Sequence, residues 1–127
     1  MTDTDYVSYP LALALKKAGF DYPCYFYYTR KDSPDDHVYS TTSEEAPIDY
    51  NRSVYAGCSM PTLAQAQKWL REKKRLSIEP YANIAVAWNY NIADLDNFAE
   101  NVGGEASSPS YESALSAGIA AALELIE

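Results

Sequence analysis

The chain has 127 residues, 47% of them hydrophobic, so it is long enough and apolar enough to fold around a core of its own. Its formal net charge is −8, which argues against nucleic-acid binding because phosphates would be repelled. No run approaches the ~20 apolar residues of a membrane span, and the acidic start does not read as a signal peptide. We therefore expect a single cytoplasmic domain over residues 1–127, with no membrane partner.

The first predicted helix follows Ser8, whose hydroxyl suits an N-cap, and it has Pro10 in its first turn. Gly19 is placed to end this helix in the left-handed conformation, so that Phe20 folds back on the last turn. Apolar residues recur at helical spacing and should face the core; they are Leu11, Ala14, Leu15 and Ala18.

Two strands are predicted next, over Cys24–Arg30 and Ile48–Cys58. The polar segment between them, Lys31–Pro47, is long for a loop, which indicates function or mobility. It leaves room for a short strand at Val38–Ser40.

The central helix is predicted over Met60–Arg75. Thr62 and Gln65 fit a capping box, in which each side chain bonds to the backbone N–H of the other residue. Trp69 should be buried, because it shares one helical face with the apolar residues Leu63, Ala66 and Leu70.

The same helix carries the basic cluster of the chain. Residues 61–76 hold five bases and one acid, whereas residues 77–127 hold eight acids and no base. The simplest interpretation is a solvated face whose cations match the negative end of the helix dipole. The alternative is a patch for an acidic partner, with Lys68, Arg71 and Arg75 as the binding residues.

Strands are then predicted over Leu76–Tyr81 and Ile84–Tyr90, joined by a tight turn near residues 82–83. The small side chains of Ala85 and Ala87 predict that a helix packs closely on the second strand. Residues 91–109 allow either a short helical turn or an irregular edge, and contain the breakers of a loop.

The last helix is predicted over Tyr111–Ile126, with Ser110 as its N-cap. Its apolar stripe consists of Leu115, Gly118, Ile119, Ala122 and Ile126. These elements together predict an α+β fold in the order α-β-β-α-β-β-α, with an antiparallel sheet of about four strands packed with two to three helices. Tyrosine supplies 12 of the 17 aromatic residues, which suits either a half-buried sheet or an interface.

Sequence motifs for catalysis are weak. The chain has no glycine-rich phosphate loop, paired-cysteine zinc pattern or nucleophile elbow. Cys24 and Cys58 are expected to be reduced, buried and inert. His37, beside Asp35 and Asp36, suits either a metal or base site or, more simply, an exposed loop. We assign no catalytic, cofactor-binding or metal-binding residue.

Three blocks of sequence, Gly19–Cys24, Met60–Lys73 and Ser110–Ile119, carry a family resemblance. In this order they resemble small proteins encoded on prophages and mobile elements of Bacteroides-type gut bacteria. The resemblance implies a basic helix terminus, then a two-strand segment, then a C-terminal helix. That family has no assigned activity, so the resemblance implies no active-site residues.

The leading functional hypothesis is therefore a non-enzymatic interaction or accessory protein of a phage or mobile element, with an unknown protein partner. The alternative is an acidic mimic of nucleic acid that occupies a DNA-binding protein. A third hypothesis is a small hydrolase that uses Cys58 or His37. We also expect a homodimer, in which the basic residues of the central helix face acids of a second copy, such as Asp94, Asp96 or Glu100.

Overall fold

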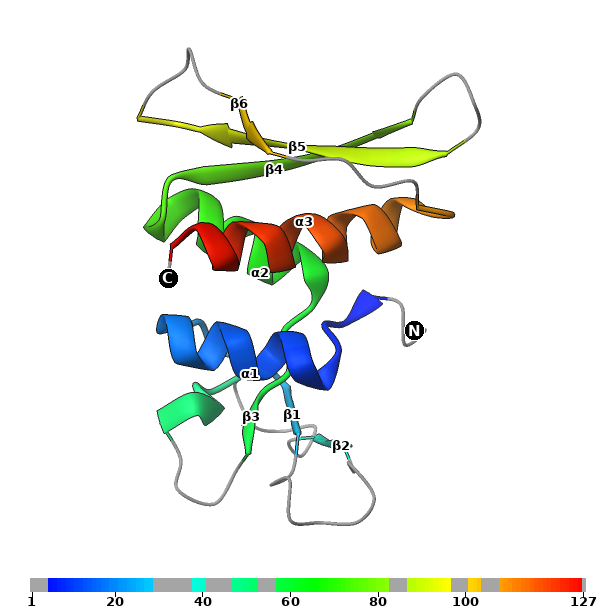
Figure 1. Cartoon of the computed structure of the whole chain (residues 1–127). Coiled ribbons are helices and arrows are strands. Elements are labelled where there is room, and N and C mark those ends of the chain that lie inside the picture. Colours follow the sequence, from blue (N-terminus) through cyan, green and yellow to red (C-terminus); the bar gives the residue numbers. More distant parts are fainter. Residues whose placement is uncertain are drawn as a thin grey trace.

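The computed structural model describes residues 5–28, 38–40, 47–52, 57–82, 87–96, 101–103 and 108–126. Figure 1 shows four layers: a sheet, a pair of helices, a single helix and a second, smaller sheet. The helices are α1 (Tyr9–Ala18), α2 (Leu63–Lys73) and α3 (Tyr111–Leu125). The strands are β1 (Phe26–Tyr28), β2 (Val38–Ser40), β3 (Cys58–Ser59), β4 (Leu76–Ala82), β5 (Trp88–Asp94) and β6 (Asn101–Gly103). None of the described helices combines the length and apolar character that crossing a membrane requires.

The strands form two antiparallel sheets, with the orders β2-β1-β3 and β4-β5-β6. The α+β class and the predicted order of helices and strands are confirmed. The prediction of one sheet of about four strands is wrong. The three helices lie between the two predicted strand pairs, so the pairs cannot join edge to edge, and each gains a third strand instead (Figure 1).

The predicted ends of α1 are confirmed. The side chain of Ser8 accepts a hydrogen bond from the backbone N–H of Leu11, and Gly19 has a φ of 100°. The N–H of Phe20 reaches back 2.9 Å to the carbonyl of Leu15, which completes the expected turn at the helix end. Local side-chain and backbone chemistry therefore fixes both termini of this helix.

The predicted capping box of α2 is also confirmed, with Thr62 and Gln65 bonding to each other's backbone. Trp69 is 2% exposed and packs against Phe20, with ring centroids 5.5 Å apart. The helix ends at Lys73, earlier than predicted. Arg75 has a φ of 59°, the left-handed region, and β4 begins at the next residue.

The β4–β5 hairpin is shifted from its predicted register. Ile78 lies opposite Ile92, and Ala82 lies opposite Trp88, so β5 starts four residues later than expected and Ala82 belongs to β4 rather than to the predicted turn. This register buries Ile78 and Ile92 together on the helix-facing side of the sheet. The ambiguous segment 91–109 supplies the end of β5 and the strand β6.

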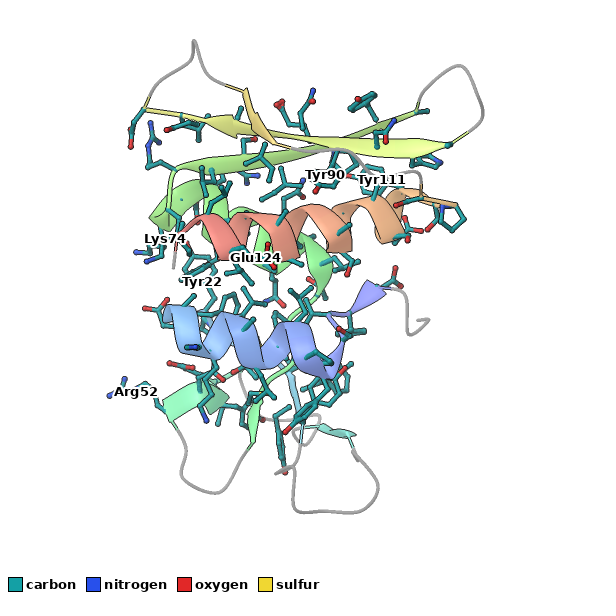
Figure 2. The ribbon with its side chains drawn as sticks, in the orientation of Figure 1. Tyr22, Arg52, Lys74, Tyr90, Tyr111 and Glu124 are labelled. Atoms are coloured by element: carbon teal, nitrogen blue, oxygen red, sulfur yellow. The ribbon has the colours of Figure 1, made fainter. Side chains whose placement is uncertain are left out.

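The close approach of α3 to this sheet has a different origin from the one predicted. Tyr90 points from β5 toward α3 (Figure 2), so the helix packs on the large side chains of β5. Ala87 lies on the opposite side of the strand by alternation, and Ala85 lies outside the described residues. The space is made by Gly118 of α3, which lies against Ile78 and Tyr90.

The small sheet is less regular than predicted. β3 contains two residues, and Ile48 pairs with Cys24 only as an isolated bridge, before the short 3-10 helix η2 (Tyr50–Arg52). Tyr28 of β1 is buried, and its hydroxyl donates to the carbonyl of Val7 at 2.7 Å. That bond ties the sheet to the segment that enters α1.

Candidate functional site

The predicted partner-binding residues lie in two different backbone settings. Lys68 and Arg71 are exposed on α2, three residues apart and therefore on one face. Arg75 follows the helix in the left-handed conformation, so it does not continue that face. Its Nε lies 3.1 Å from Oδ1 of Asp96, and the two side chains are 52% and 70% exposed. Arg75 therefore forms an exposed ion pair with an acid of its own chain.

Two further contacts fix the surroundings of this helix end. The hydroxyl of Tyr22 donates to the carboxylate of Glu72, and this bond, with smaller contributions from burial and nearby acids, raises the pKa of Tyr22 to about 12. The ammonium of Lys74 lies over the ring of Trp69, 5.5 Å from its centroid. Glu72 and Lys74, beside the predicted patch, thus have contacts within the molecule.

The two cysteines are free and buried, as predicted. Burial raises the pKa of Cys24 to about 12 and that of Cys58 to about 11. Both thiols therefore keep their protons at neutral pH, which disfavours the thiolate that a cysteine nucleophile needs. His37 lies outside the described residues. Within the described ranges, no three His, Cys, Asp or Glu side chains gather as metal ligands would.

A groove lies between α1 and α3. Three adjoining hollows, of about 460, 650 and 500 Å³, follow the two helices from their first turns to their last. The first and second share Ser8, Ser113 and Ser116, and the second and third share Ala14 and Leu123. Because neighbouring hollows share wall residues, the row of three is here called the α1–α3 groove.

Most side chains on the walls of the α1–α3 groove are small. The α1 side consists of Ser8, Pro10, Leu11, Ala14, Lys17 and Ala18. The α3 side consists of Ser113, Ser116, Ala117, Ala120, Leu123 and Glu124. Leu11 and Leu123 are buried at its floor, whereas Pro10 and Ala120 are exposed at its rim. The groove thus has an apolar floor between rims that are exposed.

The two ends of the groove differ because the three helices run in the same direction. The first hollow is lined by Ser8, Leu63 and Ser110, which mark the starts of α1, α2 and α3. The third is lined by Ala18, Lys74 and Ile126, which mark their ends. Figure 1 shows the same arrangement, with the helices starting on the side of the N mark and ending on the side of the C mark.

Charge follows this polarity. Glu112 lines the end of the groove where the three helices begin. Lys17 and Lys74 line the opposite end, where the helices stop. Glu124 lies on the wall near the second end, which leaves one net positive charge there. Figure 2 shows Lys74 beside the helix ends. The hydroxyls of Ser8 and Ser110 accept hydrogen bonds from the first turns of their own helices, and the charged side chains add to the polarity of the helix ends.

This groove was not predicted from the sequence, although one signal for it is present. Ser113, Ser116, Ala117 and Ala120 give the last helix a second face of small residues, beside its buried stripe. Only the position of α1 against that face turns it into a groove.

Comparisons with protein-family models, with curated proteins and with solved structures found no match to this chain.

Proposed function

We propose that this chain is a non-enzymatic, cytoplasmic protein-interaction module whose α1–α3 groove receives an apolar segment of a partner protein. The observation that carries the proposal is the row of adjoining hollows with an apolar floor at Leu11 and Leu123. Apolar side chains that enter such a groove are removed from water. Each Å² of apolar surface removed stabilises the complex by roughly 25 cal/mol.

The dimensions of the groove suit a helix. From Ser8 to Ala18, the α1 wall is about 15 Å long at 1.5 Å per residue, which matches about three helical turns. The small wall residues Ala14, Ala117 and Ala120 let large partner side chains reach the floor. Insertion of the apolar face of a helix into a groove is a common mode of peptide recognition.

Site-specific photo-crosslinking in the native host tests the proposal. A photo-reactive residue at Ala120, on the groove wall, should give a crosslink to one partner protein. The matched control is a photo-reactive residue at Tyr81, 42% exposed on β4 of the large sheet, which should not crosslink that protein. The substitution Ala117→Trp, which fills the groove, should abolish the product. Equal crosslinks from both positions, or a product insensitive to Ala117→Trp, would contradict the proposal.

The biological setting is proposed on narrower support. An accessory role in a phage or mobile element rests on the three sequence blocks described above. The alternative of an acidic nucleic-acid mimic rests on the net charge of −8, although Glu72 and Asp96 already bind Tyr22 and Arg75. A mimic would release its partner when DNA is added, whereas a groove-bound helix would stay. A hydrolase based on Cys58 would need a thiolate, which burial disfavours.

The homodimer stays a prediction. Asp96, one of the acids expected to face a second copy, binds Arg75 of its own chain, and Glu100 lies outside the described residues. Lys68 and Arg71 remain exposed for such a contact. Light scattering at low salt and at ~1 M salt, where the screening length is about 3 Å, tests it. A mass of 14.1 kDa at every concentration and salt would overturn the homodimer.

A further inference from the structure

We infer that the occupant of the α1–α3 groove is an amphipathic helix that lies antiparallel to α1 and α3, with acidic residues in its first turn and basic residues in its last. This inference rests on the proposed function, because it names the partner that the groove would hold. Helix direction, end charges and the composition of this chain's own helices support it.

The first argument is the direction of the helices. α1, α2 and α3 all start at one end of the groove and finish at the other. Their dipoles therefore add, with partial positive charge at the end near Ser110 and partial negative charge at the end near Ile126. A fourth helix parallel to them would place like partial charges side by side at both ends, which is unfavourable. An antiparallel helix places its own positive N-terminus beside their negative ends.

The second argument is the charge on the groove walls. An antiparallel helix brings its first turn to Lys17 and Lys74 and its last turn to Glu112. Acids in the first turn would face Lys17, Lys74 and Glu124, which together carry one net positive charge, and bases in the last turn would face Glu112. These are also the positions where such charges stabilise a helix through its own dipole. The same charges therefore stabilise the occupant as a free helix and attract it to the groove walls.

The third argument identifies the occupant as a different chain. α1 and α2 have no acidic residue in the first turn, and α3 has no basic residue in the last. None of these three helices has both acidic residues in its first turn and basic residues in its last turn, which are the two features that the groove selects. Each also buries its apolar face in its own core, as Leu15, Leu70 and Ile119 show. A helix of a second copy therefore does not fit the groove.

A pair of synthetic peptides tests the inference on the full-length protein. Each is a labelled helix of about 14 residues with leucines at i, i+3, i+4 and i+7. The first carries glutamates in its first turn and lysines in its last, and the second carries the same residues with the charges exchanged. Fluorescence anisotropy should show the first peptide binding at least about tenfold tighter than the second at low salt. The difference should shrink as salt rises.

Matched variants locate the effect. Lys17→Glu with Lys74→Glu should reverse the preference between the two peptides. Arg52→Glu with Lys73→Glu changes the net charge by the same amount at exposed residues that do not line the groove, and should leave the preference unchanged. Thermal unfolding of each variant checks that it is folded, which is expected because all four side chains are exposed.

The outcomes separate this inference from the proposed function. Equal binding of the two peptides, blocked by Ala117→Trp, would overturn the direction and charge of the occupant but keep the groove as a binding site. A preference altered equally by the control variant Arg52→Glu with Lys73→Glu would overturn the inference too. Absence of binding by either peptide would also overturn it, and the crosslinking from Ala120 would then decide the proposed function alone.

Discussion

Gly118 of α3 lies directly against Ile78 of β4. A methyl group built on Gly118 would sit 2.5 Å from Cγ2 of Ile78 and 3.1 Å from the ring of Tyr90. Real side chains do not tolerate the shorter distance, and Cγ2 of Ile78 is held on a strand and cannot swing away. The absence of a side chain at Gly118 therefore sets how closely α3 approaches the large sheet.

Gly118→Ala should accordingly destabilise the protein by about 1–3 kcal/mol, as overpacking does. Alanine is the better helix former by about 1 kcal/mol, so a clash must outweigh that gain. Urea unfolding measures the difference. Ser116→Ala, on the groove side of the same helix, is the control and should change the stability far less. A Gly118→Ala variant more stable than the parent would show that α3 is free to move outward.

Trp69→Ala should cost about 3–5 kcal/mol, because it opens a cavity at a side chain that is 2% exposed. Phe20 would lose its aromatic neighbour in the same change. Lys68→Ala, at the adjacent exposed position, is the matched control, with an expected change within about 0.5 kcal/mol. A thermal shift near zero for Trp69→Ala would contradict the observed orientation of α2.

Arg75 combines a left-handed backbone with an exposed ion pair, and two substitutions separate these features. Both Arg75→Gly and Arg75→Ala remove the contact with Asp96, but only glycine adopts a φ of 59° without strain. Arg75→Gly should therefore be about 1–2 kcal/mol more stable than Arg75→Ala. Asp96→Asn, which tests the ion pair alone, should change stability by less than about 1 kcal/mol. Equal stabilities of the glycine and alanine variants would argue against the left-handed conformation.

The buried thiols predict a loss of stability at alkaline pH. The pKa of each cysteine is raised above its ordinary value of 9.0, to about 12 for Cys24 and about 11 for Cys58. The unfolded chain therefore releases these protons from about pH 9, while the folded chain retains them. Their contribution to stability is complete below pH 9 and falls as pH rises toward 11.

Urea unfolding at pH 9 and pH 10 measures this effect. Tyrosines, whose ordinary pKa is 10.0, titrate over the same interval in parent and variant, so the difference between the two proteins isolates the cysteines. The double variant Cys24→Ala with Cys58→Ala should lose less stability over that interval than the parent. The native thiols should also resist a thiol reagent at neutral pH without denaturant. Rapid labelling of either cysteine, or identical pH slopes for parent and variant, would contradict the burial of these groups.

The sequence predicted best what neighbouring residues decide. The caps at Ser8, Thr62 and Ser110 depend on a side chain three residues from its partner, and all three are present. The buried side of α2 followed from helical spacing alone. Strand limits were less accurate: the register of β5 is decided by pairing Ile92 with Ile78, far away in the chain, rather than by local alternation.

The site was harder to predict than the fold. A continuous helix through residue 75 would place Lys68, Arg71 and Arg75 on one face. The observed helix ends at Lys73, and Arg75 has a left-handed backbone. No glycine marks the turn, so the usual signal was missing. The α1–α3 groove arises from the packing of two helices separated by most of the chain, a relationship that spacing within either helix does not contain.

The two sheets also differ in how much chain must close before they form. β4 and β5 are joined by residues 83–87, whereas β1 and β3 are separated by residues 29–57. Closing the longer loop loses more conformational entropy for fewer paired residues. We therefore expect the β4–β5 hairpin to form in the folding transition state, and the small sheet to form after it. Substitutions at Ile92 should slow folding, whereas substitutions at Cys58 should mainly speed unfolding.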